Sequence, residues 1–187
     1  MALVIADYGR GNLRSLVKAF ERIGVIPVVS GDAAVIRDAD RIVLPGVGSF
    51  GDCMQGVDGL RDALDDVVLV RGCPFLGICA GMQVMGDRGF ENGEHQGLGW
   101  IPGDVKHIGM RMGWDGVVCG HPVVPSGEYY FMHSYGFDAG DQRDVVGFAG
   151  YGHAVIGRDN MIGVQFHPEK SHALGLRVLE RFAGWTP

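Results

Sequence analysis

One cysteine lies in a sequence context that could support nucleophilic catalysis. Cys79 is the centre of Gly77-Ile78-Cys79-Ala80-Gly81, a G-x-C-x-G motif directly after an apolar run. In the comparable G-x-S-x-G motif the nucleophile lies in a strained strand-to-helix turn, and the flanking glycines allow close packing. A cysteine there would lie at a helix N-terminus, where the helix dipole favours the thiolate. The motif alone equally fits a tight turn that contains a buried cysteine.

A histidine and a glutamate near the other end of the chain could complete a catalytic triad. His167 and Glu169 lie two residues apart at the end of an apolar run, so their side chains would face the same way on a strand. The carboxylate can orient the imidazole, which then serves as base toward a thiol and as acid toward a leaving amine. By itself, a His-x-Glu pair is more often a solvated strand end. Together with Cys79, the pair predicts a Cys-His-Glu triad.

A glycine-rich loop is a candidate for part of an oxyanion hole. Pro45-Gly46-Val47-Gly48 follows a predicted strand, and the amides of Val47 and Gly48 have little side chain around them. One of these amides could turn toward a carbonyl oxygen, while the amide of Ala80 beside the nucleophile would supply the second donor. The loop does not match the dinucleotide-binding G-x-G-x-x-G pattern, and an ordinary loop remains the alternative.

The elements that must position these residues follow from hydrophobic periodicity. Asn12 could cap a first helix that ends near Gly24, and a longer helical stretch from about 50 to 70 is expected to break near Gly56 and Gly59. Short apolar runs typical of buried parallel strands lie at 3–6, 25–29, 41–44 and 74–78. This alternation predicts an α/β fold with a doubly wound, mainly parallel sheet, in which Cys79 would lie at the edge where ligands bind.

The pattern of hydrophobic residues is different in the second half of the chain. Short segments rich in Val, Ile, Phe and Tyr, separated by Gly, Asp and Asn, predict an added antiparallel region. These segments lie near 96–107, 115–118, 128–132, 145–149, 153–157 and 161–166. A closing helix is predicted after Ser171. Because no linker or repeat interrupts the pattern, a single domain over residues 1–187 is expected.

Composition excludes several classes of function. Hydrophobic residues make up 47% and charged residues 20% of the 187 residues, which argues against a disordered chain. The net charge of −6 comes without a basic stripe, so no nucleic-acid partner is expected. No apolar run approaches the ~20 residues of a membrane span, and the N-terminus lacks the basic region of a signal peptide. The four cysteines have no metal-binding spacing, so we expect no metal and a reducing, cytoplasmic location.

Seven motifs together resemble those of class I (triad-type) glutamine amidotransferases. Within this family the similarity is greatest to the glutaminase subunits of imidazole glycerol phosphate synthase, from histidine biosynthesis. The resemblance covers essentially the whole chain. The motifs are Asp7–Ser15, Leu44–Gly48, Gly77–Gln83, Gly97–Gly103, Met112–Trp114, His133–Tyr135 and Gln165–Ser171.

The resemblance implies a reaction, a substrate and a partner. Cys79 would attack the side-chain amide of glutamine with the help of His167 and Glu169, and no cofactor would be needed. The ammonia would pass to a separate (β/α)8-barrel synthase subunit, so the enzyme would be a heterodimer. The amino-acid end of glutamine would be held by the residues that match Gln83, Glu91, His133, Ser134 and Tyr135.

Some of these residues also have simpler interpretations, and the sequence departs from the family in places. Glu91 fits a solvated loop acid equally well, and the His133 imidazole fits a satisfied strand histidine better. Ala80 stands where a larger apolar residue is usual, and the usual Lys-x-Pro-His does not precede Met112. Three alternatives therefore remain open. The glutaminase could serve another synthase, such as one for surface-sugar amination; the chain could be a catalytically silent interaction module; or it could be an independent amidase.

Overall fold

A mixed, eleven-stranded sheet forms the centre of the computed structural model, which describes residues 2–187. Its parallel half has the order β2-β1-β3-β4-β11. These strands are β1 (Leu3–Ala6), β2 (Val28–Ser30), β3 (Arg41–Gly46), β4 (Phe75–Cys79) and β11 (Met161–Val164). The register pairs Gly46 at the end of β3 with Cys79 at the end of β4. The glycine-rich loop Pro45–Gly48, which we call the oxyanion loop, therefore lies directly beside the turn that contains the predicted nucleophile Cys79.

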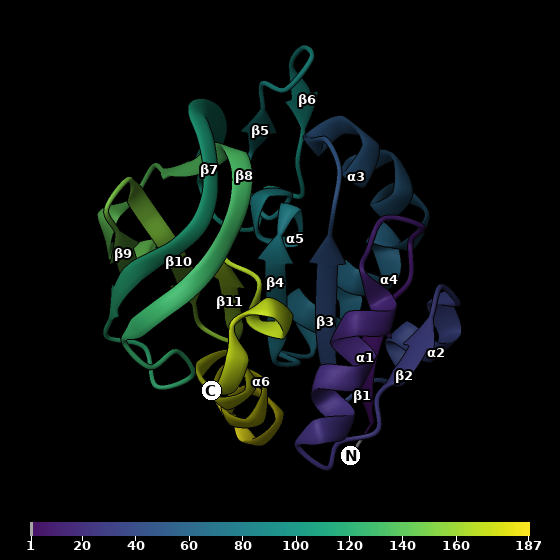
Figure 1. Ribbon diagram of the computed structural model, residues 1–187. Helices are drawn as coiled ribbons and strands as arrows, with labels where there is room; N and C mark the ends of the chain where they lie inside the picture. Colours follow the sequence, from purple (N-terminus) through teal and green to yellow (C-terminus); the bar gives the residue numbers. More distant parts are fainter. Residues whose placement is uncertain (1) are drawn as a thin grey trace.

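Helices cover both faces of the parallel half (Figure 1). One face carries α1 (Leu13–Arg22) and α6 (His172–Gly184), and the other carries α2 (Ala33–Arg37), α3 (Phe50–Val57) and α4 (Arg61–Asp65). Short helical turns, η1 (Asp58–Leu60) and η2 (Asp66–Val70), precede and follow α4. Within β1, alternate side chains pack in opposite layers, because successive residues of a strand point to opposite faces. The doubly wound arrangement is confirmed.

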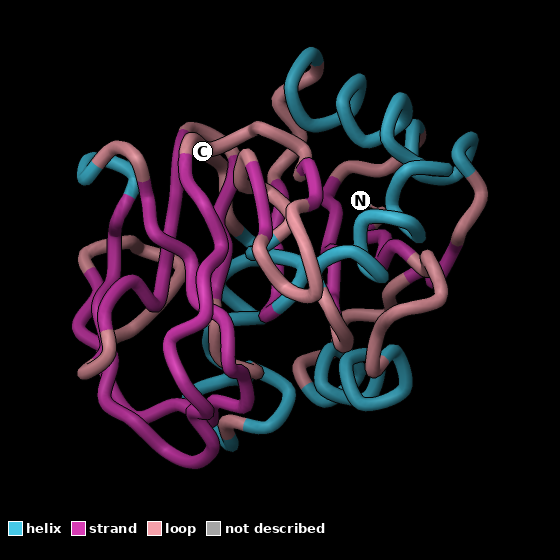
Figure 2. The backbone as a smooth tube through the Cα atoms, turned by 90° about the horizontal axis from the view of Figure 1, so that it is seen from above, coloured by secondary structure: helices cyan, strands magenta, loops and turns pink. Residues whose placement is uncertain are grey.

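The other half of the sheet is antiparallel. It continues from β11 through β10 (Gly152–Arg158) and β9 (Val145–Ala149) to a long ribbon of β7 (Gly103–Cys119) and β8 (Gly127–Ala139). Figure 2 shows this ribbon side of the molecule, which holds few helices, opposite the helix-rich parallel half. The remaining short elements are α5 (Ala80–Gln83), β5 (Arg88–Gly89), β6 (His95–Gln96), η3 (Gln142–Asp144) and η4 (Pro168–Lys170).

Three local predictions differ from the structure. The strand expected at 25–29 begins only at Val28, and the helix start at Asn12 has no side-chain capping hydrogen bond. Of the strand expected at 96–107, only residues 103–107 are in β7, and this single strand also contains the strand expected at 115–118. A register shift between His107 and Arg111 absorbs Gly109, at φ +84°, without ending the pairing with β8. Within residues 2–187, the helices are all too short or too polar to span a bilayer.

Candidate active site

Cys79 occupies a strained turn between β4 and α5. Its backbone has φ 54° and ψ −113°, and a positive φ is uncommon for a residue with a side chain. The next residue, Ala80, is the first of α5, so its amide has no intrahelical acceptor. The side chain of Cys79 is largely buried, with 7% of the residue exposed. The turn therefore has the geometry of a nucleophile elbow.

The glycines around Cys79 are required by close backbone packing. A Cβ on Gly81 would overlap the carbonyl oxygen of Leu44, and one on Gly77 would lie 2.6 Å from the carbonyl oxygen of Gly81. Gly46 at the end of β3 is packed equally closely against the amide of Gly81. The elbow is therefore fixed against the neighbouring strand by contacts that leave no room for side chains.

His167 and Glu169 form a buried pair beside the end of β11. The Nδ1 of His167 donates to Oε1 of Glu169 at 3.0 Å. The backbone of His167 is held as well, because its amide donates to Tyr130 O at 2.9 Å and its carbonyl accepts from Ser171 Oγ at 2.7 Å. This hydrogen bond to the carboxylate leaves Nε2 as the nitrogen available to another group.

The electrostatics of His167 depend on Cys79 as well as on Glu169. Burial acts to lower the pKa of His167, but its interactions with Cys79 and Glu169 outweigh burial and raise the pKa above its ordinary value. Nε2 is buried and has no hydrogen-bond partner among residues 2–187. This nitrogen can therefore accept and hold a proton from the thiol, and the nearby carboxylate stabilises the imidazolium.

A cavity of about 210 Å³ opens over Cys79. Except for Glu169, which lies behind His167, every predicted site residue lines it. The lining residues are Val47, Gly48, Cys79, Ala80, Gln83, Glu91, Met132, His133, Ser134, Tyr135 and His167. Met132 is the one member that the sequence analysis did not name. Residues from five separate parts of the chain are thus brought to one place.

The polar residues of this cavity already hold one another. Nε2 of Gln83 donates to the carbonyl of Tyr135 at 2.8 Å, and the same carbonyl accepts from Nδ1 of His133 at 2.8 Å. Burial lowers the pKa of His133, which favours its neutral form. The Oε2 of Glu91 accepts from the amide of Phe50 at 2.9 Å. Glu91 is therefore a lining residue with a structural contact at the start of α3.

Gln165 contacts the sulfur and was not predicted. Its Nε2 lies 3.6 Å from Sγ of Cys79, and its Oε1 accepts from Nε2 of Gln83 at 3.0 Å. A signal was available, because a polar residue two positions before His167 in an apolar strand must face the same side. Gln165 thus links Cys79 to Gln83 through buried hydrogen bonds.

The glycine-rich loop after β3 does not point its Val47 amide into the cavity. That amide donates to the carbonyl oxygen of Arg10, in the loop between β1 and α1, at 3.2 Å. On the side of β3, Tyr8 OH donates to the carbonyl oxygen of Pro45 at 2.6 Å. In this conformation the cavity lacks the Val47 donor that the sequence suggested.

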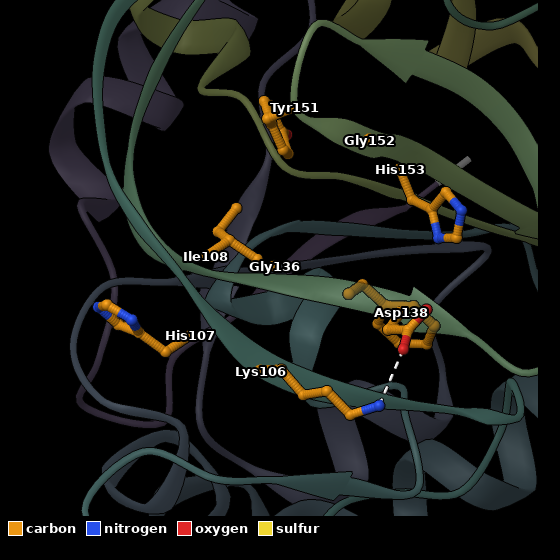
Figure 3. Close-up of a pocket in the computed structure, with 9 residues that line it drawn as sticks. Lys106, His107, Ile108, Gly136, Asp138, Tyr151, Gly152 and His153 are labelled. Carbon is orange, nitrogen blue, oxygen red and sulfur yellow. Dashed lines mark hydrogen bonds and ion pairs between the residues drawn. The ribbon is translucent and has the colours of Figure 1, made fainter.

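A larger cavity lies elsewhere on the antiparallel half (Figure 3). It measures about 340 Å³ and is formed by β7, β8 and the start of β10. At its rim Lys106 reaches across to Asp138, with 2.8 Å between Nζ and Oδ2, and His107 and His153 are also present. No cysteine or serine is among its described lining residues. The cavity over Cys79 is therefore the candidate active site, despite its smaller volume.

Comparison with curated proteins gives full-length matches. A relative from Brucella abortus, named imidazole glycerol phosphate synthase subunit HisH, is 44% identical, and the match covers 100% of both chains. Relatives of the same name from Rhodospirillum rubrum and Ruegeria pomeroyi are 44% and 43% identical, again over 100% of each chain.

Solved structures agree on the fold. A glutamine amidotransferase crystal structure superposes with a TM-score of 0.81 at 16% identity, covering 99% of this chain and 100% of that one. The PurLQS structure from Thermotoga maritima gives a TM-score of 0.75 at 19% identity, with 98% and 97% covered. The family model described as glutamine amidotransferase class-I matches residues 4–183. With nearly the whole chain matched and relatives above 40% identity over full length, this protein belongs to the class-I glutamine amidotransferases.

Proposed function

We propose that the chain hydrolyses glutamine to glutamate and ammonia, as the glutaminase subunit of an imidazole glycerol phosphate synthase in histidine biosynthesis. The observation that carries the chemistry is the buried His167–Glu169 pair beside Cys79, which lies under the cavity. The pathway is supported by the relatives named as subunits of that synthase, which match this chain over its full length.

The first half of the reaction forms a thioester. Sγ of Cys79 attacks the side-chain carbonyl carbon of glutamine, and the thiol proton moves to Nε2 of His167. The oxyanion of the tetrahedral intermediate is stabilised by the Ala80 amide and by a second donor from Val47 or Gly48. The C–N bond then breaks, His167 returns the proton to the leaving nitrogen, and ammonia departs.

The second half regenerates the enzyme. A water molecule attacks the γ-glutamyl thioester while His167 takes its proton. The second tetrahedral intermediate collapses with loss of the Cys79 thiolate, which recovers its proton from His167, and glutamate leaves. Glu169 keeps the imidazole in one orientation through both halves and stabilises its charged form.

The remaining lining residues bind the amino-acid end of glutamine in this proposal. Gln83 and the backbone of His133, Ser134 and Tyr135 supply polar groups on one wall. The Glu91 carboxylate provides a negative charge for the substrate ammonium. Support comes from their shared cavity and from the hydrogen bond that fixes Gln83 to the Tyr135 carbonyl.

The partner in this proposal is a (β/α)8-barrel synthase subunit, which receives the ammonia in a heterodimer. Exposed apolar side chains on β7, Met110, Met112 and Trp114, offer the kind of surface that protein interfaces bury. Action in the cytoplasm is supported by the cysteines, all four of which are free. We propose neither a metal nor a cofactor for the reaction.

One experiment separates the two activities. The complex purified with its synthase partner is assayed with glutamine and, separately, with ammonium salt as the nitrogen source. Cys79→Ala is expected to reduce glutamine-dependent synthesis by about 10⁶-fold, to background, while ammonia-dependent synthesis continues. The loss of both activities in a correctly assembled complex would contradict the division of labour.

A further inference from the structure

A single residue of the β1–α1 loop contacts both the oxyanion loop and the helix that follows it. The carbonyl oxygen of Arg10 accepts the Val47 amide hydrogen bond at 3.2 Å. The side chain of Arg10 extends further, and its NH2 group lies 3.3 Å from Oδ1 of Asp52 in the first turn of α3. The backbone of Arg10 therefore binds the oxyanion loop itself, and its side chain binds the helix that follows this loop.

Asp52 is itself fixed. Its Oδ2 accepts from Ser49 Oγ at 2.8 Å, and its amide donates back to Ser49 Oγ at 3.3 Å. Ser49 is the N-cap residue of α3, directly after the oxyanion loop. Because two hydrogen bonds hold Asp52 to the helix start, an ion pair with Asp52 also restrains the Arg10 backbone.

The other end of the loop, where it follows β3, is held by a different hydrogen bond. Tyr8 OH donates to Pro45 O at 2.6 Å. Burial raises the pKa of Tyr8 above its ordinary value, so the phenol keeps the proton that it donates. The Val47 amide belongs to the next peptide group, between Gly46 and Val47. That peptide can rotate while the Tyr8 hydrogen bond is kept, which makes Pro45 a fixed pivot.

We propose that the ion pair between Arg10 and Asp52 is a latch that contributes to keeping the oxyanion hole incomplete in the lone chain. It holds the Arg10 carbonyl where it binds the Val47 amide, and it therefore stabilises the loop orientation that lacks the second donor. Binding of the synthase partner must overcome this latch. The inference rests on the proposed glutaminase function and adds a regulatory positioning role for Arg10 and Asp52.

The expected size of the effect on kcat follows from the solvent exposure of the two side chains. The side chains of Arg10 and Asp52 are 46% and 47% exposed. An exposed ion pair changes a two-state population by up to about fivefold, and salt screens it further. Loss of the latch should therefore raise kcat of the lone chain about two- to fivefold. KM for glutamine should stay unchanged, because neither residue lines the cavity.

The test measures glutamate production by the isolated full-length chain as salt is raised from about 0.05 to about 0.5 M NaCl. Wild-type kcat should increase with salt toward the value of the unlatched variants. Arg10→Ala and Asp52→Asn should each show the higher kcat already at low salt, with no further response. The double variant should equal each single variant, since both remove the same pair.

Two matched variants separate the latch from general effects of charge. Arg143 and Asp141 also form an exposed ion pair, with 2.6 Å between their charged atoms, and lie outside the site. Arg143→Ala should therefore keep the wild-type kcat and the wild-type salt response. Arg10→Lys retains the positive charge and should restore most of the latch. In the complex with saturating partner and nucleotide ligand, all four single variants should match wild type.

The outcomes distinguish this inference from the function on which it rests. If the wild-type complex hydrolyses glutamine but Arg10→Ala and Asp52→Asn have wild-type kcat in the lone chain, the latch is refuted and the glutaminase stands. A salt response that persists in both variants has the same meaning. If the wild-type complex shows no activity above that of Cys79→Ala, the proposed function itself fails.

Discussion

The two turns that face the cavity follow adjacent strands and yet differ in their freedom. The elbow after β4 is packed so closely that Gly77 and Gly81 have no space for a Cβ. The loop after β3 exposes 40% of Val47, and a Cβ at Gly48 would meet only open space among the described residues. The comparison supports the proposed division of roles, in which the elbow would fix the nucleophile and the loop would provide an adjustable oxyanion donor.

The largest expected effects test the elbow side of the site, where Cys79, His167 and Glu169 are held in place. His167→Ala should lower glutamine hydrolysis by about 10⁶-fold, whereas Glu169→Gln should lower it by about 10⁴-fold, because the imidazole carries the proton and the carboxylate only orients and stabilises it. Steady-state kinetics of the lone chain and of the complex measure both. If the elbow side is prearranged, the two factors should be the same with and without the partner.

Two results would contradict these roles. A larger loss in Glu169→Gln than in His167→Ala would reverse the assignment of base and orienter. A loss that depended strongly on the partner would mean that the elbow side also rearranges. Circular dichroism of each variant controls for folding, since both side chains lie at a strand end above the sheet.

The next largest effect tests the loop after β3, which we propose to be adjustable. The lone chain should be a poor glutaminase, and the partner with bound nucleotide should raise kcat by about 10²- to 10³-fold, the usual value of one oxyanion donor. The physical reason is the engagement of the Val47 amide with Arg10 O. Full activity in the lone chain, unchanged on assembly, would refute the gated loop and favour an independent amidase.

A stability measurement sharpens the comparison from the packing side. Gly81→Ala forces a methyl group onto the Leu44 carbonyl, so the free energy of unfolding should fall by about 1–3 kcal/mol or more. Gly59→Ala is the matched control, because its Cβ would meet no described atom. Urea unfolding of both variants gives the difference. Equal stability would show that the elbow is less tightly fixed than its packing implies.

The smallest effect is a change of one pKa. Cys79 and Glu169 raise the pKa of His167 against the lowering effect of burial. Removing the thiol in Cys79→Ala should therefore lower the pKa of His167, as measured by NMR titration of the imidazole. The value should be the same in the lone chain and in the complex. A pKa that is unchanged by the substitution would show that the thiol does not act on this imidazole.

Sequence patterns predicted the features that depend only on residues close together in the chain. The continuous apolar run that forms β1 and the glycines around Cys79 are such features, and the fold class is confirmed. The continuity of β7 was missed, because Gly109 and Gly113 are typical of breaks and only pairing with β8 carries the strand past them. Helix capping by Asn12 was expected from residue type and does not occur.

The candidate site divides in the same way. Except for Met132, the residues that line the cavity could be named from motifs, although their catalytic and binding roles stay predictions. The direction of the Val47 amide could not be predicted, because it depends on a carbonyl in a loop that is distant in sequence. Gln165 was within reach of the strand alternation rule, but its contact with Sγ requires the pairing of β11 with β4.

The central position of β11 governs when the site can exist during synthesis. β11 is the last strand along the chain, yet it inserts between β4 and β10 and leads into His167. A growing chain folds from its N-terminal part, and contacts between distant residues form slowly. Until residues 161–164 pair with β4, one edge of that strand is open and Cys79 lacks its proposed base, His167. In the proposed mechanism, incomplete chains therefore release no ammonia, and catalytic competence arises only with the final strand.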